Sequence, residues 1–243
     1  MLEAPTKSIL LMIFAYLAGS IPFAYIISLS YGNIDIREHG SGNAGATNVF
    51  RILGPLPGLA TLLLDALKGF LIVFISLRWI PPAGFGYNYF MWGLIICLIS
   101  FLAIVGHSYP VWLNFKGGKS VAVSLGVLAA LMSWWIFIPI GIFVIMVAIT
   151  RYVSIGSLTS TISVPVIFLT YHTYPHSGNS SDSVFIAFSI LMALVVVLRQ
   201  TSNIKRLLKG TENRFGVKAK KPAEDKTSMV IIPPDEEPNS ENE

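Results

Sequence analysis

Charge is scarce in this sequence. Charged residues make up 12% of its 243 positions and hydrophobic residues 53%, whereas a typical soluble domain carries about 25% charged residues. A chain of this length cannot bury so many apolar side chains in a soluble core, so the composition predicts an integral membrane protein. The formal net charge of +4 does not indicate a nucleic-acid partner. The basic residues gather toward the C-terminus, where they suit anionic lipid headgroups.

Cysteine and metal-ligand clusters are also nearly absent. The single cysteine, Cys97, excludes an intramolecular disulfide and a cysteine metal site, and its place in an apolar run indicates a small buried residue. No histidine–glutamate cluster of the metal-binding kind occurs, so we expect neither a metal nor another cofactor. The halves 1–120 and 121–243 show no repeat, which argues against a transporter built from repeated units.

The sequence consists largely of long apolar runs. A helix needs about 20 apolar residues to cross a bilayer, and the runs predict an all-α protein with about seven transmembrane helices. The first run is long for a signal peptide and further spans follow it, so we expect it to be retained. The approximate spans are 8–31, 57–80, 89–106, 120–135, 136–150, 153–171 and 183–200.

The division between the fourth and fifth spans is open. Residues 121–150 contain no charge and are too many for one ordinary span. Trp134 and Trp135 near their middle suit a membrane–water interface, and Pro139 could start or kink the next helix. The sequence fits two short spans, a re-entrant pair, or a five-span topology in which this run does not cross twice.

Basic residues fall in alternate connections. With seven spans, the odd connections and the C-terminal tail carry Lys or Arg, and the even ones carry none apart from Arg78 near the end of the second span. Because cytoplasmic loops carry the excess of these residues, the N-terminus is predicted outside and the C-terminus in the cytoplasm. We expect one transmembrane domain over 1–216 and a disordered cytoplasmic tail over 217–243.

The first basic connection holds the string GSGNAGATNVFR. Closely spaced glycines let the backbone approach a ligand, and successive exposed N–H groups can form an anion-binding concavity. Neutral side-chain donors and an arginine, whose planar cation suits phosphate, favour a phosphate site over a merely flexible connection. The candidate residues are Gly40, Ser41, Gly42, Asn43, Gly45, Thr47, Asn48 and Arg51.

The second basic connection follows GHSYP and contains FKGGKS. Two glycines flanked by lysines at the start of a helix are chemically similar to a phosphate loop, with backbone N–H groups facing the anion, although the glycine spacing of a Walker motif is absent. The alternative is a pair of interfacial lysines. The candidates are Lys116, Gly117, Gly118 and Lys119, together with His107, which could instead be a structural histidine.

Two further strings, RYVSIGS and NIKRLLKGTE, carry polar residues three positions apart, which places each pair on one helix face. The pairs are Ser154 with Ser157 and Asn203 with Arg206. The alternatives are small residues for helix packing and an interfacial amphipathic helix. Asp65 and Lys68 are also three apart, inside the second span, which indicates a structural or supporting ion pair rather than a proton relay.

These four strings, in order, resemble the motifs of the bacterial acyl-phosphate:glycerol-3-phosphate acyltransferase family (PlsY-like) over roughly residues 8–214. The resemblance implies a seven-helix enzyme of the bacterial inner membrane with its motifs on the cytoplasmic side. It implies transfer of a fatty acyl group from acyl phosphate to the 1-hydroxyl of glycerol 3-phosphate, giving lysophosphatidic acid and phosphate. We expect a monomer that uses no cofactor and has the lipid bilayer as its surroundings.

The sequence departs from the family pattern at three places. The family commonly has NPG where this chain has Asn43-Ala44-Gly45, and GGKGVAT where it has GGKSVAV. These two changes affect loop stiffness more than chemistry. A histidine often follows the arginine that matches Arg199, but this chain has Gln200, so it gives no support to an obligatory role for that histidine.

The resemblance and the chemistry of the strings together predict the site. Direct attack of the glycerol hydroxyl on the acyl carbon needs orientation and charge stabilisation more than a strong acid. The base is either His107 or a phosphate oxygen of the substrate. The predicted catalytic residues are Ser41, Asn43, Arg51, His107, Lys119, Ser154 and Asn203, and the predicted phosphate ligands are Gly40, Gly42, Gly45, Asn48, Lys116, Gly117, Gly118, Ser157 and Arg206.

Other classes fit parts of the pattern. A carrier or channel for an organic phosphate would use the same anion-binding loops. A lipid-linked sugar-phosphate transferase usually needs acidic residues and a divalent metal, and few acids lie on the predicted cytoplasmic side, chiefly Asp35, Glu38 and Glu212. The H-x-x-x-x-D pattern of the other large class of glycerol-phosphate acyltransferases follows none of the four histidines.

Overall fold

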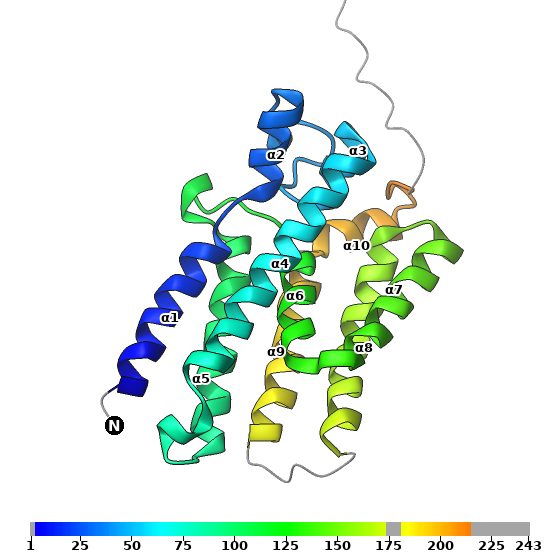
Figure 1. The fold of residues 1–243 in the computed structure, drawn as a ribbon. Helices are drawn as coiled ribbons and strands as arrows, with labels where there is room; N and C mark the ends of the chain where they lie inside the picture. The colour runs from blue at the N-terminus through cyan, green and yellow to red at the C-terminus, as the bar shows by residue number, and fades with distance from the viewer. Residues whose placement is uncertain (1–2, 174–180, 215–243) are drawn as a thin grey trace, which may run out of the picture.

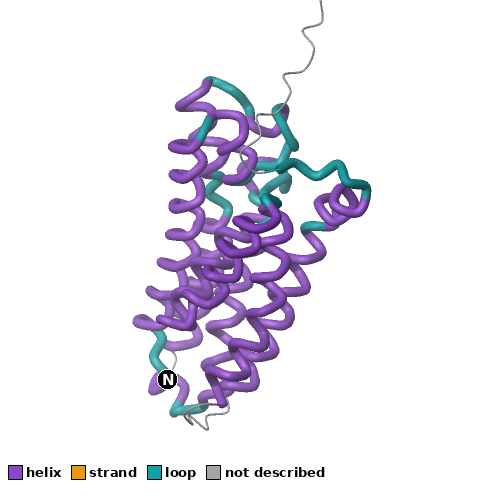
Figure 2. The backbone as a smooth tube through the Cα atoms, turned by 90° about the vertical axis from the view of Figure 1, so that its right-hand side faces the viewer, coloured by secondary structure: helices purple, strands orange, loops and turns teal. Residues whose placement is uncertain are grey.

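The computed structural model describes residues 3–173 and 181–214, and in this part of the chain helices are joined by short loops (Figure 2). The longer helices lie side by side as a bundle (Figure 1). The predicted tail, 217–243, lies outside the described residues. The α-helices are α1 (Glu3–Gly19), α2 (Phe23–Gly32), α3 (Ala46–Leu53), α4 (Pro55–Trp79), α5 (Tyr89–Ser108), α6 (Val121–Met132), α7 (Phe137–Thr150), α8 (Val153–Thr173), α9 (Ser181–Arg199) and α10 (Thr201–Leu208).

The first predicted span, 8–31, is interrupted. The prediction of one continuous helix was wrong here, because α1 ends at Gly19 and α2 begins at Phe23. Pro22 explains the break, since proline cannot donate a backbone N–H and disfavours helical geometry at the residue before it. The Ile21 carbonyl lies in this break, where it accepts from the Phe23 N–H at 3.2 Å and from Lys68 Nζ at 2.6 Å.

Residues 121–150 form two short helices that run in opposite directions (Figure 1). A 3₁₀ turn over Ser133–Ile136 separates α6 from α7, and Pro139 lies in the first turn of α7. By length and composition, six helical stretches in the described ranges could cross a membrane, with Val121–Thr150 counted as one. At about 1.5 Å per residue, α6 and α7 rise only about 18 and 21 Å, less than the roughly 30 Å of a hydrocarbon core.

Close helix contacts hold the bundle together. Gly106 on α5 lies against the Tyr16 carbonyl of α1, and Gly126 on α6 lies against the Ala66 carbonyl of α4, so that a Cβ atom at either glycine would overlap the neighbouring backbone. Small residues allow such approach between membrane helices. Many large apolar side chains on the outer surface are exposed, among them Ile149, which is 75% exposed. An apolar outer surface suits a surrounding of lipid.

The segments that carry the four sequence strings gather at one end of the bundle, the upper end in Figure 1, where α2, α3 and α10 lie. Arg199 links two of these segments. Its Nη2 atom donates to the carbonyls of Ser108 at 3.3 Å and Gly118 at 2.9 Å. The end of α9 is therefore fixed to the loop before α6, which places α10 beside that loop.

Candidate active site

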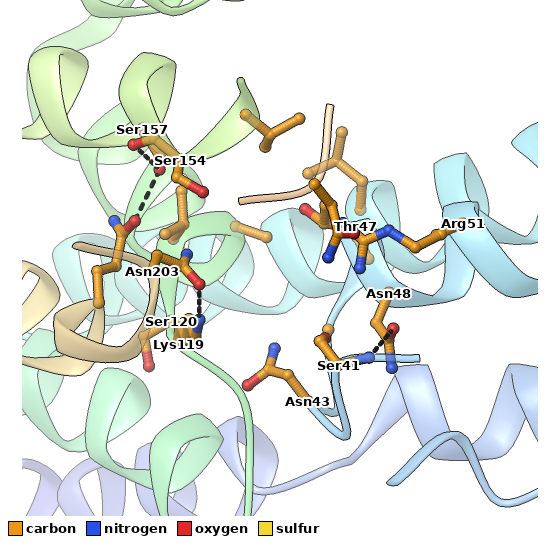
Figure 3. A pocket seen from close by; sticks show the side chains of 18 of the residues that line it. Ser41, Asn43, Thr47, Asn48, Arg51, Lys119, Ser120, Ser154, Ser157 and Asn203 are labelled. Atoms are coloured by element: carbon orange, nitrogen blue, oxygen red, sulfur yellow. Dashed lines mark hydrogen bonds between the residues drawn. The ribbon is translucent and has the colours of Figure 1, made fainter. Parts of the chain in front are cut away.

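A cavity of about 140 Å³ opens at this end of the bundle. Figure 3 shows Lys119, Ser154 and Asn203 across an open space from Arg51 and Thr47. All of the predicted catalytic residues line the cavity: Ser41, Asn43, Arg51, His107, Lys119, Ser154 and Asn203. Four of the predicted phosphate ligands also line it, namely Gly45, Asn48, Ser157 and Arg206. The structure thus brings together side chains that are up to 165 positions apart in the sequence, from Ser41 to Arg206.

Asn48 holds the first loop in shape. Its Oδ1 atom accepts from the Ser41 N–H at 3.0 Å, and its Nδ2 atom donates to the carbonyls of Ile36 and His39. Gly40 has a φ of +61°, a conformation that glycine adopts readily, and a Cβ atom there would overlap the Asn48 amide. Asn48 is 1% exposed, so its amide organises the loop around the cavity.

Three backbone N–H groups of this loop are not available for the predicted anion-binding concavity. The N–H of Ser41 bonds to Asn48, that of Gly42 to the His39 carbonyl and that of Gly45 to the Asn43 carbonyl. The prediction that the glycine backbone faces an anion was therefore wrong for these groups, because the turn itself consumes them. Gly40 and Gly42 do not line the cavity; the loop contributes the side chains of Ser41 and Asn43.

The second loop also differs from its prediction. The N–H groups of Gly117 and Gly118 donate to the carbonyls of Ser108 and His107, at 3.2 and 3.1 Å. Carbonyls at the end of a helix lack partners within it, and these two glycines supply partners at the end of α5. Gly117 and Gly118 are consequently absent from the cavity lining, and the exposed Lys116 lies outside it as well. Lys119 is the cation that this loop directs inward.

Lys119 contacts α10 on one side of the cavity. Its Nζ atom donates to Asn203 Oδ1 at 2.6 Å (Figure 3). Burial and, to a smaller extent, the positive charge of Arg206 lower the pKa of Lys119 to about 8, while Glu212 opposes this shift. Burial also lowers the pKa of Arg51. The cavity therefore holds partly desolvated cations, which attract anions more strongly than cations in open water do.

Glu212 is a cavity residue that the sequence analysis noted only as one of a few acids. Its Oε1 atom accepts from Ser154 Oγ, and its Oε2 atom accepts from Arg206 Nε at 2.6 Å. Arg206 also donates to Asn203 Oδ1. The carboxylate thus joins α8 to α10 and offsets one of the positive charges. Its place in the string NIKRLLKGTE was the signal available in the sequence.

Gln200 is a second residue that the prediction missed. It lines the cavity and is 1% exposed. Its Oε1 atom accepts from Ser157 Oγ at 3.0 Å, whereas its Nε2 atom has no hydrogen-bond partner in the described part of the chain. Leaving a buried polar group unpaired is costly, so this amide nitrogen is a donor available to a ligand. The departure from histidine at this position was the only sequence signal.

His107 lies in a buried polar cluster with two residues of α4. Its Nδ1 atom is 3.1 Å from Lys68 Nζ and 3.4 Å from Asp65 Oδ1. Lys68 Nζ is in turn 2.8 Å from Asp65 Oδ1. Asp65 and Lys68 form the predicted ion pair, and Asp65 and His107 also line the cavity. The sequence spacing predicts this pair but not its contact with His107.

The assembled groups suit a small phosphorylated ligand. Three cations, Lys119, Arg51 and Arg206, line the cavity together with two carboxylates, Glu212 and Asp65, and Asp65 is already paired with Lys68. Arginine forks and lysine ammonium groups are the usual phosphate ligands. Serine and asparagine side chains supply neutral hydrogen-bonding groups. Over residues 3–173 and 181–214, no group of three or more His, Cys, Asp or Glu residues is placed to hold a metal ion.

Comparison with known proteins places this geometry in context. The profile of the family described as "Glycerol-3-phosphate acyltransferase" matches residues 9–210. The glycerol-3-phosphate acyltransferase of Thermosynechococcus vestitus is 40% identical over 215 residues, which cover 85% of this chain and 94% of that protein. That of Endomicrobium trichonymphae is 42% identical over 213 residues, which cover 88% of this chain and 98% of that protein.

Two crystal structures resemble the whole bundle. Both are of PlsY (YgiH), an integral membrane glycerol 3-phosphate acyltransferase, one in its glycerol 3-phosphate form and one in its lysophosphatidic acid form. Their TM-scores are 0.73 and 0.71. Each is 36% identical in sequence, and the match covers 86% of this chain and 96% of that chain.

Proposed function

The chain belongs to the glycerol-3-phosphate acyltransferase family of multi-pass membrane enzymes, and from this premise we propose that its acyl donor is an acyl phosphate. The acceptor is the 1-hydroxyl of sn-glycerol 3-phosphate, and the products are lysophosphatidic acid and inorganic phosphate. The observation that carries the proposal is the cavity in which Lys119, Arg51 and Arg206 converge with neutral hydrogen-bonding groups. Both substrates carry phosphate, and this site offers several cations for it.

The reaction is a direct acyl transfer. The glycerol hydroxyl oxygen attacks the acyl carbon, and the bond between that carbon and the phosphate oxygen breaks. The hydroxyl proton passes to a base, and the phosphate leaves with the bonding electron pair. Because an acyl phosphate is a mixed anhydride with a good leaving group, the site mainly needs to orient the reactants and stabilise charge.

The side chains have distinct roles in this proposal. Lys119 and Arg51 hold the phosphates, and their partial burial supports the assignment. Ser41, Ser154 and Asn203 orient the attacking hydroxyl or the developing oxyanion. The backbone N–H groups of Ser41, Gly42 and Gly45 do not enter the proposal, because they are already bonded. No base adjoins Ser41 among its described hydrogen bonds, so we favour direct attack over an acyl-serine intermediate. A trapped acyl adduct on Ser41 would reverse that preference.

The basic residues also bear on how the protein is oriented in the membrane. We propose that the cavity faces the cytoplasm, that the N-terminus lies outside, and that the protein is a monomer of the bacterial inner membrane with a single domain over 1–216. The supporting observation is that the cavity lies at the end of the bundle where α10 and the lysine-bearing loop before α6 meet. Cytoplasmic loops carry the excess of Lys and Arg. The run over 121–150 then crosses as two short helices, which gives seven spans.

The direct test uses purified protein in detergent with palmitoyl phosphate and glycerol 3-phosphate. EDTA is present, and both phosphate and lysophosphatidic acid are followed. We expect the two products in equal amounts. Absence of product from a folded protein that glycerol 3-phosphate still stabilises would contradict the acyl-phosphate proposal. Uptake of glycerol 3-phosphate into liposomes would then identify a carrier.

A further inference from the structure

Lys68 is a buried ammonium group with a full set of partners. It lies in the middle of α4 and is 7% exposed. Its Nζ atom is 2.6 Å from the Ile21 carbonyl, 2.8 Å from Asp65 Oδ1 and 3.1 Å from His107 Nδ1. A lysine ammonium group has three N–H donors and no acceptor. The Ile21 carbonyl accepts one of these protons, Asp65 is an ion-pair partner, and His107 Nδ1 is the remaining neighbour within hydrogen-bond distance, placed to accept a proton from Lys68.

This contact fixes the protonation of the imidazole. If Nδ1 accepts a hydrogen bond from Lys68, the proton of the neutral ring is on Nε2. The other arrangement would place a proton on Nδ1 and direct it at Asp65 Oδ1. That distance is longer, at 3.4 Å, and the proton would then stand against the ammonium group of Lys68. The cluster of Asp65, Lys68 and His107 therefore favours a neutral imidazole with an Nε2–H donor.

The Nε2 atom of His107 faces the loop that carries Lys119. A Cβ atom at Gly118 would overlap Nε2, so the ring lies directly against the Gly118 backbone. The Gly118 N–H bonds to the His107 carbonyl, and Arg199 bonds to the Gly118 carbonyl at 2.9 Å. The ring is thus held by Lys68 on one edge and by this loop on the other, and it lines the cavity.

We propose that Lys68 is a positioning residue: it holds His107 as a neutral imidazole whose Nε2–H is a hydrogen-bond donor to an anionic oxygen of the bound substrate. His107 then acts as a donor and not as the base of the reaction. This inference rests on the proposed function, because the anionic oxygen belongs to a substrate phosphate or to the oxyanion. It also gives a role to a charged pair inside a membrane span, where charges are costly.

The first test observes the tautomer directly and needs no change at Lys68. The other three histidines, at positions 39, 172 and 176, are replaced by glutamine, and the protein is labelled with nitrogen-15 histidine. We expect the nitrogen spectrum at neutral pH to show a bare Nδ1 and a protonated Nε2. A ring protonated on Nδ1, alone or on both nitrogens, overturns the proposal. The measurement is independent of acyl transfer, so it separates this inference from the proposed function.

The second test uses side chains that mimic one nitrogen each. The amide nitrogen of His107→Gln reaches the place of Nε2, and that of His107→Asn reaches the place of Nδ1. Losing a hydrogen bond to a charged group costs about ten- to a hundredfold, whereas losing a general base costs about 10²- to 10⁴-fold. We expect the glutamine variant to stay within about tenfold of wild type, and the asparagine and alanine variants to lose more. A glutamine variant as inactive as the alanine variant overturns the donor role.

A double-mutant cycle connects Lys68 to this role. Lys68→Met should lower kcat/KM by about tenfold when His107 is present. In the His107→Gln background the same change should lower kcat/KM by less than about twofold, because a glutamine amide has no tautomers for Lys68 to select between. Equal losses in both backgrounds would show that Lys68 acts only through the fold. If Lys68→Met does not insert, the spectrum of the wild-type histidine still decides the proposal.

Discussion

Lys119 combines burial with positive neighbours, and both disfavour its own charge. Its pKa of about 8 lies well below that of an exposed lysine. The cation is present below this pH and is lost as the pH rises through it. We therefore expect kcat/KM for glycerol 3-phosphate to fall above about pH 8, since this ratio reports the groups of the free enzyme. Measuring kcat/KM from about pH 6 to about pH 10 checks the prediction.

The matched control for this profile is Lys119→Arg, which keeps its charge at all these pH values. The alkaline fall should be absent in that variant, even if its activity is lower overall because the guanidinium has another shape. The same fall in both proteins would assign the titration to a different group.

Removal of the Lys119 charge is a separate prediction. Lys119→Met keeps most of the side-chain volume and removes one of the two donors to Asn203 Oδ1. We expect kcat/KM to fall by about 10²- to 10³-fold, as for the loss of a charge-stabilising group in other active sites, with unchanged expression in the membrane. Retained activity would remove Lys119 from the site.

Gln200 supports a prediction about a neutral donor. Gln200→Met removes an acceptor of Ser157 and the unpaired amide nitrogen of a residue that lines the cavity. We expect kcat/KM to fall by about tenfold or more. Gln200→His should keep most of the activity, because a neutral imidazole can accept from Ser157 and also donate. Steady-state kinetics of the two variants decides whether the position is a donor or only fills space.

The sequence could place these residues only in part. Charge, polarity and motif order identified Lys119, Arg51 and Asn203, because such side chains near a predicted membrane surface are unusual. The sequence does not indicate the roles of Glu212 and Gln200, because these depend on contacts across 43 positions between Ser157 and Gln200 and 58 positions between Ser154 and Glu212. The glycine spacing also suggested loop N–H groups for an anion, since hydrogen bonds within a turn cannot be read from that spacing.

At the scale of elements, the loop between α2 and α3 depends on one amide. Asn48→Ala would leave the N–H of Ser41 without its partner, and it would remove one of two donors from the carbonyls of Ile36 and His39. Each lost bond costs about 1 kcal/mol, so we expect faster hydrogen exchange over residues 36–45 and low activity in a bundle that is otherwise intact. Hydrogen-exchange mass spectrometry measures this. Unchanged exchange in that segment would contradict the role of Asn48.

Asn48→Asp is the informative companion to this variant. The carboxylate can accept from Ser41 but cannot donate to the two carbonyls. Its exchange should therefore resemble that of the alanine variant more than that of wild type.

The apolar runs predicted the positions of the long helices well, because an apolar stretch of membrane length has few other stable forms. Two helix boundaries were harder to predict. Pro22 could have indicated the break after α1, but its surroundings are as apolar as the rest of the span. The paired tryptophans did indicate the turn between α6 and α7, and the two directions of these helices required the packing against α4 and α8 that the structure provides.

At the scale of the whole molecule, the proposed orientation can be tested with introduced cysteines. The only native cysteine, Cys97, is buried in α5, so it gives little background. Ala83→Cys and Lys209→Cys place exposed thiols near opposite ends of the bundle. In intact bacteria, a membrane-impermeant maleimide should label position 83 at once and position 209 only after permeabilisation. The reverse labelling pattern would show that the protein has the opposite orientation to the one proposed.

The shortness of α7 has a mechanical consequence. A bilayer thicker than a helix must thin around it, or the helix must change its tilt or recruit flanking residues to the interface. Phe143 on α7 lines the cavity, and its carbonyl lies against Gly156 on α8 with no space for a Cβ atom between them. A change in the tilt of α7 would therefore move a wall of the cavity. Hydrophobic mismatch at α7 thus couples membrane thickness to the shape of the cavity. We therefore expect turnover to depend on the length of the surrounding lipid chains.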